Sequence, residues 1–261
     1  MNILVTGVGS TLGYGILETI KQTDFDCQVS GADYLDTAVG LYQVDYPYLL
    51  PDIYQDPQKE IIWLNALKKI ISERRIKYVL VGLDFEVPLF AKHKACLENI
   101  NDCKVVVSSP EVVNICNDKW LTNCFLRDSG FDVPRACLPE GLEEFVKFTP
   151  LPWIVKPRTG STSKGLFKVN NIEALSHALD NCDNAIIQEE VGDVEGEFTC
   201  GVVVAHGRVL SSIALRRRLK NGNTSVAYFN ESAEVDGYVR QVAEKLKPDG
   251  PINIQLRLTT D

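Results

Sequence analysis

Apolar residues in the first third of the chain recur with the periods of alternating strands and helices. Residues 2–6 form a short apolar run, and after a glycine-rich turn Leu12, Ile16, Leu17 and Ile20 fall on one face of a helix. Three more apolar strands follow, at residues 27–34, 76–84 and 104–109. One more amphipathic helix is predicted between the first two of them, at residues 63–75. This alternation predicts an α/β fold with a doubly wound parallel sheet, whose ligands gather at the carboxyl ends of the strands.

The pattern changes near Pro110. Two short helices are predicted, the second from about Asp118 to Asp128 and closed by Gly130. A set of strands and two further helices follows, with a hairpin signal, HGR, at residues 206–208. The strands are expected at residues 153–157, 166–169, 185–191, 197–215 and 251–258, and the helices at 172–182 and 233–247. We therefore expect a first domain at residues 1–110 and a mixed, largely antiparallel α+β domain at residues 111–261.

Composition narrows the class of protein. The 261 residues are 45% hydrophobic and 24% charged, as in a globular protein with a sizeable core. The net charge of -8 argues against general affinity for nucleic acid or anionic membrane. The chain has no apolar run of membrane-spanning length and no signal peptide features at its start, so we expect a cytoplasmic protein. The eight cysteines form no C-x-x-C pair and the three histidines lie far apart, which argues against a structural zinc site.

Gly7, Gly9 and Gly13 follow the first strand with the spacing G-x-G-x-x-x-G, a variant of the dinucleotide fingerprint. Asp33, at the end of the second strand, could accept a hydrogen bond from a ribose hydroxyl. One interpretation is therefore an NAD-linked short-chain oxidoreductase, although the sequence has no Tyr-x-x-x-Lys pair. The other is a structural turn in a sheet that binds no cofactor.

The segment IVKPRTGSTSKG, residues 154–165, carries Lys156 out of an apolar strand into a loop of small, hydroxylated and basic residues. It is not a P-loop, because Lys164 is followed by Gly165 and Leu166 rather than by a hydroxyl residue and a helix. A turn of a β-hairpin and a cover over phosphate groups are both compatible with these residues.

Four ordered segments resemble the ATP-grasp superfamily, and more narrowly the large subunit of carbamoyl-phosphate synthase and its short relatives. They are NDKWLTNCFLRDSGFDVPR, WIVKPRTGSTSKG, IIQEEVGDVEGEFT and NIQLR. The resemblance covers essentially the whole chain and implies a Rossmann-like pre-ATP-grasp domain followed by an ATP-grasp domain with a lid subdomain at about residues 118–188.

The resemblance also implies roles for individual residues. Lys119 and Lys156 resemble the two lysines that bind nucleotide phosphates, an ammonium being a suitable point charge for that purpose. The segment Glu190–Gly192 resembles the hinge that bonds adenine through backbone groups, and Glu197 the acid that accepts from ribose hydroxyls. The mobile glycine-rich loop over the phosphates would comprise Gly160, Ser161, Thr162, Ser163, Lys164 and Gly165. The middle residue of the hinge would be Val191.

Three arginines in ALRRRL occupy a predicted strand, so Arg216 and Arg218 share one face and Arg217 takes the other. We assign Arg216 and Arg218 to the site, where they would meet the γ-phosphate or an anionic substrate. An exposed strand edge protected by charge is the alternative. Gln255 resembles the family's first magnesium ligand, an oxygen donor suited to a hard cation.

The family continues beyond the position of Asp261 into a strand with a Glu and an Asn that complete the magnesium site, so we expect full turnover by this chain to be impaired. The implied parent activity is ATP-dependent ligation of small-molecule carboxylate and amine (or ammonia) substrates through an acyl phosphate, with Mg²⁺ or Mn²⁺ as the metal ion. A non-catalytic ATP-binding or regulatory module is the alternative. No nucleic acid or membrane partner is expected, and a homodimer is left open.

Overall fold

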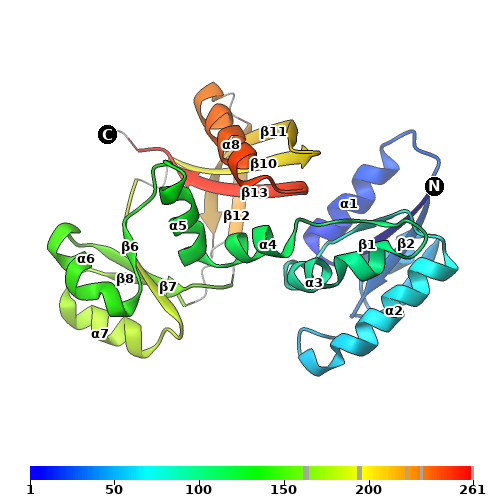
Figure 1. Ribbon diagram of the computed structural model, residues 1–261, viewed down its shortest axis with the longest axis horizontal. Helices are drawn as coiled ribbons and strands as arrows, with labels where there is room; N and C mark the ends of the chain where they lie inside the picture. The colour runs from blue at the N-terminus through cyan, green and yellow to red at the C-terminus, as the bar shows by residue number, and fades with distance from the viewer. Residues whose placement is uncertain (161–164, 193–195, 221–222, 230–231, 260–261) are drawn as a thin grey trace. The chain divides into compact units, whose positions relative to one another are not determined.

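The computed structural model describes residues 1–160, 165–192, 196–220, 223–229 and 232–259 (Figure 1). The chain divides into two compact units, Met1–Pro110 and Glu111–Asp261. Within the described ranges no helix is long and apolar enough to cross a membrane.

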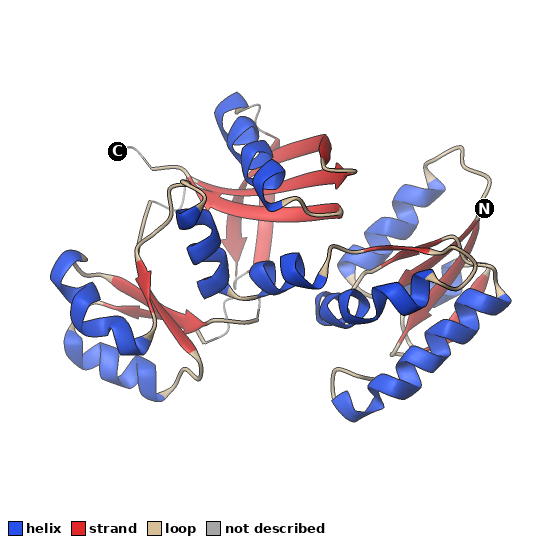
Figure 2. Cartoon of the chain, in the orientation of Figure 1, coloured by secondary structure: helices blue, strands red, loops and turns tan. Residues whose placement is uncertain are grey.

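The first unit is a five-stranded parallel sheet with helices on both of its faces (Figure 2). The order of the strands is β3-β2-β1-β4-β5, which confirms the predicted doubly wound sheet. The strands are β1 (Asn2–Thr6), β2 (Gln28–Asp33), β3 (Tyr46–Leu49), β4 (Tyr78–Leu80) and β5 (Lys104–Val106). The helices are α1 (Thr11–Lys21), α2 (Glu60–Glu73) and α3 (Val87–Glu98), with 3-10 helices η1 (Val39–Gln43), η2 (Pro57–Lys59) and η3 (Asp84–Glu86).

Buried apolar side chains lie between this sheet and its helices. On one face Val5, Val8 and Leu17 pack together beneath α1. Trp63 of α2 and Phe90 of α3 are fully buried, and their rings meet edge to face with centroids 4.9 Å apart. β3 is not among the predicted strands, because it is a short edge strand interrupted by Pro47 and such a segment carries a weak strand signal.

The second unit contains two antiparallel four-stranded sheets, β12-β11-β10-β13 and β6-β9-β7-β8, as the mixed α+β prediction requires. Its strands are β6 (Ala136–Cys137), β7 (Trp153–Pro157), β8 (Phe167–Val169), β9 (Ala185–Glu189), β10 (Glu197–Ala205), β11 (Arg208–Lys220), β12 (Asn223–Phe229) and β13 (Gly250–Arg257). Its helices are α4 (Pro110–Asn117), α5 (Lys119–Asp128), α6 (Leu142–Phe148), α7 (Ile172–Asp180) and α8 (Ala233–Leu246), with η4 (Pro139–Gly141).

Each of these sheets has one face covered by helices. Trp153 and Val155 of β7 are buried beneath α6 and α7. Phe198 and Cys200 of β10 are buried against α8. Because side chains alternate along a strand, Lys156 of β7 and Glu197 of β10 project from the faces that these helices leave uncovered.

The predicted hairpin between β10 and β11 is confirmed. His206 and Gly207 both have positive φ, 52° and 71°, which suits a two-residue turn between twisted strands. Its strand pairing begins at Ala205 and Arg208. The sequence analysis does not anticipate that β11 returns as a second hairpin with β12.

The glycine turn after β1 is closed by its own contacts. Ser10 caps α1, since its Oγ accepts from Gly13 N at 2.9 Å and donates to Gly82 O at 2.7 Å. Asp33 accepts from Gly9 N at 2.8 Å through Oδ2 and from Leu35 N at 3.0 Å through Oδ1. Gly9 N, Gly13 N and the Asp33 carboxylate therefore have hydrogen-bond partners in and next to this turn.

Replacing Gly7 with alanine is expected to lower the free energy of unfolding by about 2 to 3 kcal/mol and to leave ATP affinity unchanged. Gly7 has φ +59°, and a Cβ there would lie 2.3 Å from Leu83 Cγ. Urea unfolding and an ATP titration on the same variant check both halves. Gly15→Ala is the control, because no atom lies within 4 Å of that Cβ and alanine favours the helix by about 0.5 to 1 kcal/mol. Lost ATP affinity with unchanged stability would instead place the nucleotide at this turn.

Candidate functional site

Lys156 leaves β7 from the face of the sheet that α6 and α7 do not cover. The side chain is half-buried, and its Nζ donates to Gln188 Oε1 of neighbouring β9 at 2.7 Å. Burial lowers the pKa of Lys156 to about 8, and the positive charges of Lys119 and Arg257 add to this effect. The positive charges of Lys119 and Arg257 thus disfavour the protonated form of Lys156, and a bound anion would offset that repulsion.

Lys119 is the first residue of α5 and lies against the segment that leads into the glycine-rich loop. Its Nζ donates to Gly160 O at 2.9 Å and to Arg158 O at 3.3 Å, and burial lowers its pKa. Lys119 therefore lies at the start of this loop, as a phosphate-binding role would require. Gly165 is described at the loop's other end, whereas Ser161–Lys164 lie outside the described residues.

A bidentate ion pair fixes the start of α5 to the end of β7. Asp118 caps the helix by accepting from Trp120 N and Leu121 N, and it also pairs with Arg158 at 2.6 Å between Oδ2 and Nη2. The guanidinium and the helix amides together lower the pKa of Asp118 against the opposing effect of its burial. Sequence reasoning misses this pair; the signal was a basic residue two positions after Lys156 and an N-cap acid before Lys119.

The hinge after β9 offers backbone groups. Glu190 N donates to Pro152 O at 3.2 Å, and the Glu190 carboxylate pairs with Lys168 Nζ at 2.6 Å. Gly192 has φ +65°, a conformation that favours glycine. The carboxylate and the N–H of Glu190 thus both have partners within this unit.

Glu197 lies between two arginines on the uncovered face of the sheet that contains β10. Its Oε1 accepts from Arg217 Nη2 at 2.7 Å, and its Oε2 accepts from Arg257 Nη2 at 3.2 Å. Arg217 Nη2 also donates to Gln255 Oε1 at 2.9 Å. The side chains of Glu197 and Arg217 are only 10% and 11% exposed, whereas Gln255 and Arg257 are exposed. The network therefore has a buried ion pair at its centre, a solvent-accessible edge and an excess of positive charge.

Residues 116–249, just over half of the chain, match the family described as the ATP-grasp domain. The chain belongs to the ATP-grasp family. The ATP-grasp match spans Lys119, Lys156, the hinge and Glu197, so one family domain contains all of the contacts described above except those of Gln255 and Arg257.

Solved structures share this fold at low sequence identity. An N5-carboxyaminoimidazole ribonucleotide synthetase in its ADP complex is 17% identical with TM-score 0.77, over 100% of this chain and 67% of its own. An L-amino acid ligase from Bacillus licheniformis is 17% identical with TM-score 0.72, over 100% of this chain and 64% of its own. The biotin carboxylase of Campylobacter jejuni is 14% identical with TM-score 0.74, over 99% and 62% respectively. This ATP-grasp chain thus spans about two thirds of the length of these proteins.

Arg216 and Arg218 do not share a face with the other predicted site residues of this ATP-grasp domain. Arg216 pairs in register with Phe198, whose side chain is buried on the α8 side, and Arg216 and Arg218 both lie over the ring of Tyr228, at 5.4 and 5.8 Å. Arg217 is the arginine that contacts both Glu197 and Gln255. The assignment of Arg216 and Arg218 to the site stays a prediction, and on this strand it would place them on the opposite face from Glu197. Strand alternation separates the two faces but does not tell which face receives a ligand.

Gln255 does not make a magnesium site with its described neighbours. Its Oε1 accepts from Arg217, and Arg257 lies on the same strand two residues further on. Within the described ranges no group of three or more His, Cys, Asp or Glu side chains could hold a metal ion. Since Mg²⁺ prefers carboxylate and water oxygens, two nearby guanidinium groups are a poor setting for it, and we assign no magnesium chemistry to these residues.

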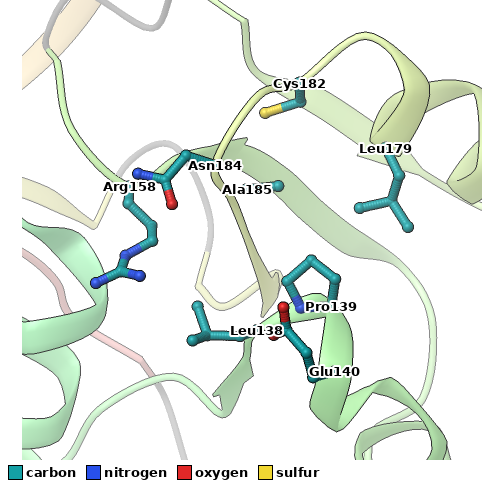
Figure 3. A pocket seen from close by; sticks show the side chains of 8 residues that line it. All are labelled: Leu138, Pro139, Glu140, Arg158, Leu179, Cys182, Asn184 and Ala185. Atoms are coloured by element: carbon teal, nitrogen blue, oxygen red, sulfur yellow. The ribbon is translucent and has the colours of Figure 1, made fainter.

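A cavity of about 340 Å³ lies elsewhere in the second unit (Figure 3). Its lining comes from the η4 segment, the connection from α7 to β9, and Arg158 (Figure 3). The lining residues are Leu138, Pro139, Glu140, Arg158, Leu179, Cys182, Asn184 and Ala185. Neither Lys156 nor Glu197 lines it, but Arg158 does, and Lys119 Nζ donates to the Arg158 carbonyl, so the cavity adjoins the segment that leads into the glycine-rich loop.

Proposed function

We propose that this chain binds ATP in its second unit. Lys119 and Lys156 would neutralise phosphate oxygens, the hinge backbone at Glu190 and Gly192 would bond adenine, and Glu197 would face the ribose hydroxyls. The loop from Gly160 to Gly165 would cover the phosphates. These roles follow the family resemblance and fit the directions in which the described side chains point.

One observation carries this proposal above the others. Lys156 is a half-buried lysine whose pKa is lowered to about 8 while Lys119 and Arg257 stand nearby, and its hydrogen-bond partner is an amide rather than a carboxylate. A purely structural lysine would be expected to have a neutralising partner. A polyphosphate would supply that charge.

The reaction we propose is ATP-dependent ligation of a carboxylate to an amine or ammonia. The carboxylate oxygen attacks the γ-phosphorus, ADP leaves, and the acyl phosphate is captured by the amine nitrogen with release of inorganic phosphate and a proton. Protein groups act in such a transfer mainly by positioning and by neutralising charge, which lysines and a closing loop supply without a protein nucleophile. Two similar structures are of an ADP complex and of a β-γ-ATP complex.

The proposed substrates are a carboxylate or bicarbonate and a nitrogen nucleophile. The similar proteins named as a carboxyaminoimidazole synthetase, an amino acid ligase and a biotin carboxylase suggest carboxylate or bicarbonate activation followed by attack of nitrogen. A reaction like that of the carbamoyl-phosphate synthase large subunit, which the sequence resembles, falls within this class.

Calorimetric titration and thermal unfolding of the chain with ATP, ADP, GTP and NAD test the binding. ATP and ADP are expected to bind, and ATP at about a hundred times its dissociation constant should add about 2.7 kcal/mol to the free energy of unfolding. Binding of NAD without ATP would overturn the proposal. Release of ADP that depends on both a carboxylate and an amine would support the ligase, whereas tight ATP binding with no ADP release across a panel of both would favour a non-catalytic module.

A further inference from the structure

Arg257 joins the hinge to the first residue of β10. It ends β13, where it pairs in register with Glu197, and its two terminal nitrogens go to different partners. Nη1 donates to Val191 O at 3.2 Å, and Nη2 donates to Glu197 Oε2 at 3.2 Å. Its side chain is one third exposed, at 34%.

Val191 and Glu197 lie at the two ends of the connection between β9 and β10, which belong to different sheets. Arg217 also holds Glu197, but its other contacts, Gln255 and Thr224, lie within the sheet of β10. Arg257 thus performs a different task from Arg217: it ties the edge of one sheet to the hinge that follows the other.

The contact with Val191 sets the direction of a neighbouring donor. The carbonyl of Val191 and the N–H of Gly192 belong to one peptide unit, and in a trans peptide these two bonds point in opposite directions. Since Arg257 holds the carbonyl, the Gly192 N–H is aimed away from the guanidinium. Gly192 also lets Arg257 approach, because a Cβ at that position would lie 3.2 Å from Arg257 Cβ.

We propose that Arg257 is a positioning residue for nucleotide recognition, which fixes the Val191–Gly192 peptide and the Glu197 carboxylate in one geometry. This inference rests on the proposed function, since it assigns the Gly192 N–H to the base and Glu197 to the ribose. A planar guanidinium with two forked nitrogens can bond both partners at once, whereas the single ammonium of lysine keeps the charge without that fork.

The deciding comparison is Arg257→Lys against wild type, with ATP and inorganic tripolyphosphate as separate probes in calorimetric titrations. Tripolyphosphate reports on the lysines alone, because it has neither base nor ribose. Arg257→Lys is expected to weaken ATP binding by about tenfold, the scale of a lost charged hydrogen bond, and to leave tripolyphosphate binding within about twofold. Arg208→Leu, at an exposed position on β11, is the control and should change neither.

Several outcomes would overturn the inference. If Arg257→Lys binds ATP with the same affinity as wild type, the forked geometry of Arg257 has no role in nucleotide binding and only its charge matters. Equal loss of ATP and tripolyphosphate would indicate general damage to the site, which thermal unfolding of the variant would also report. If the wild-type chain binds neither ATP nor tripolyphosphate, the proposed function fails and this inference fails with it. That result is distinct from the two above because it is seen in the wild-type protein, without any substitution.

Discussion

Lys156→Met is expected to weaken ATP binding by about a hundredfold and, at the same time, to raise the free energy of unfolding of the nucleotide-free chain at pH 7. The loss of affinity reflects a charge-assisted contact to phosphate, worth about 1.5 to 3 kcal/mol. A lysine pKa moved from 10.5 to about 8 corresponds to about 3 kcal/mol of cost for holding the charge in the folded state. Methionine would leave Gln188 Oε1 without its donor at about 1 kcal/mol, so a net gain of about 1 to 2 kcal/mol is expected.

The gain in stability should depend on pH with a definite sign. Below pH 8 the lysine is protonated in both the folded and the unfolded states, so the cost of burying the charge is fully present. Between pH 8 and 10.5 the unfolded chain binds more protons, so wild-type stability rises with pH relative to the variant and the advantage of methionine shrinks. Urea unfolding at pH 7 and pH 10 measures this difference.

Lys147→Met is the matched control, because Lys147 is an exposed lysine, 60% accessible, paired with Glu144 on α6. It should change stability by no more than about 0.5 kcal/mol and leave ATP affinity unaltered. An unchanged ATP affinity in Lys156→Met would remove Lys156 from the site. A loss of stability at pH 7 would show that its ammonium has a neutralising partner in solution.

Glu197→Gln is expected to lower the free energy of unfolding by about 3 kcal/mol, the largest destabilisation among the substitutions considered. The replacement keeps the shape of the side chain but leaves Arg217, whose side chain is 11% exposed, without its counter-charge. Removing one partner of a buried, hydrogen-bonded ion pair typically costs about 3 to 5 kcal/mol, because the remaining charge is left uncompensated. Chemical unfolding of the variant measures the loss.

Two comparisons separate this mechanism from a general effect of mutation. Glu244→Gln removes the same charge from an exposed position on α8 and should fall within about 0.5 kcal/mol of wild type. Adding Arg217→Met to Glu197→Gln should restore part of the loss, because the unpaired guanidinium is then gone. Additive effects of the two substitutions would contradict a direct charge coupling between them.

Much of the fold can be predicted from the sequence, because the signals for helix ends and tight turns lie within a few neighbouring residues. Gly130, at φ +83°, ends the second short helix as expected, and His206-Gly207 forms the expected turn. β3 escapes prediction because the pairing that stabilises it, with β2, is not a local property of the four residues in YPYL. For the same reason η4, which packs against the distant strand β9, gives no clear signal in the sequence.

Some candidate site residues can likewise be identified from local sequence, whereas others depend on contacts between distant parts of the chain. Lys156 stands out in the sequence because an apolar strand delivers it into a loop of small residues, and the structure places it among other cations. Whether Arg217 or its neighbours Arg216 and Arg218 contact Glu197 depends on which face of the sheet α8 covers. That in turn depends on apolar packing between β10 or β11 and α8, which lies about 20 to 40 positions further along the chain. Arg158 and Arg257 lie inside two of the quoted segments, WIVKPRTGSTSKG and NIQLR, but the resemblance gives neither of them a role, and their partners Asp118 and Val191 are distant in the sequence.

The sequence by itself determines the class of this protein: a parallel α/β unit, then an antiparallel unit with the ordered ATP-grasp segments. Those features depend on the spacing of apolar residues and on short motifs, which act over a few residues. Only the tertiary structure decides that Arg257 reaches Val191, 66 positions away, and Glu197, 60 positions away. Contacts over such separations depend on strand register and on which face the helices cover, and neither is encoded at the positions that make the contact.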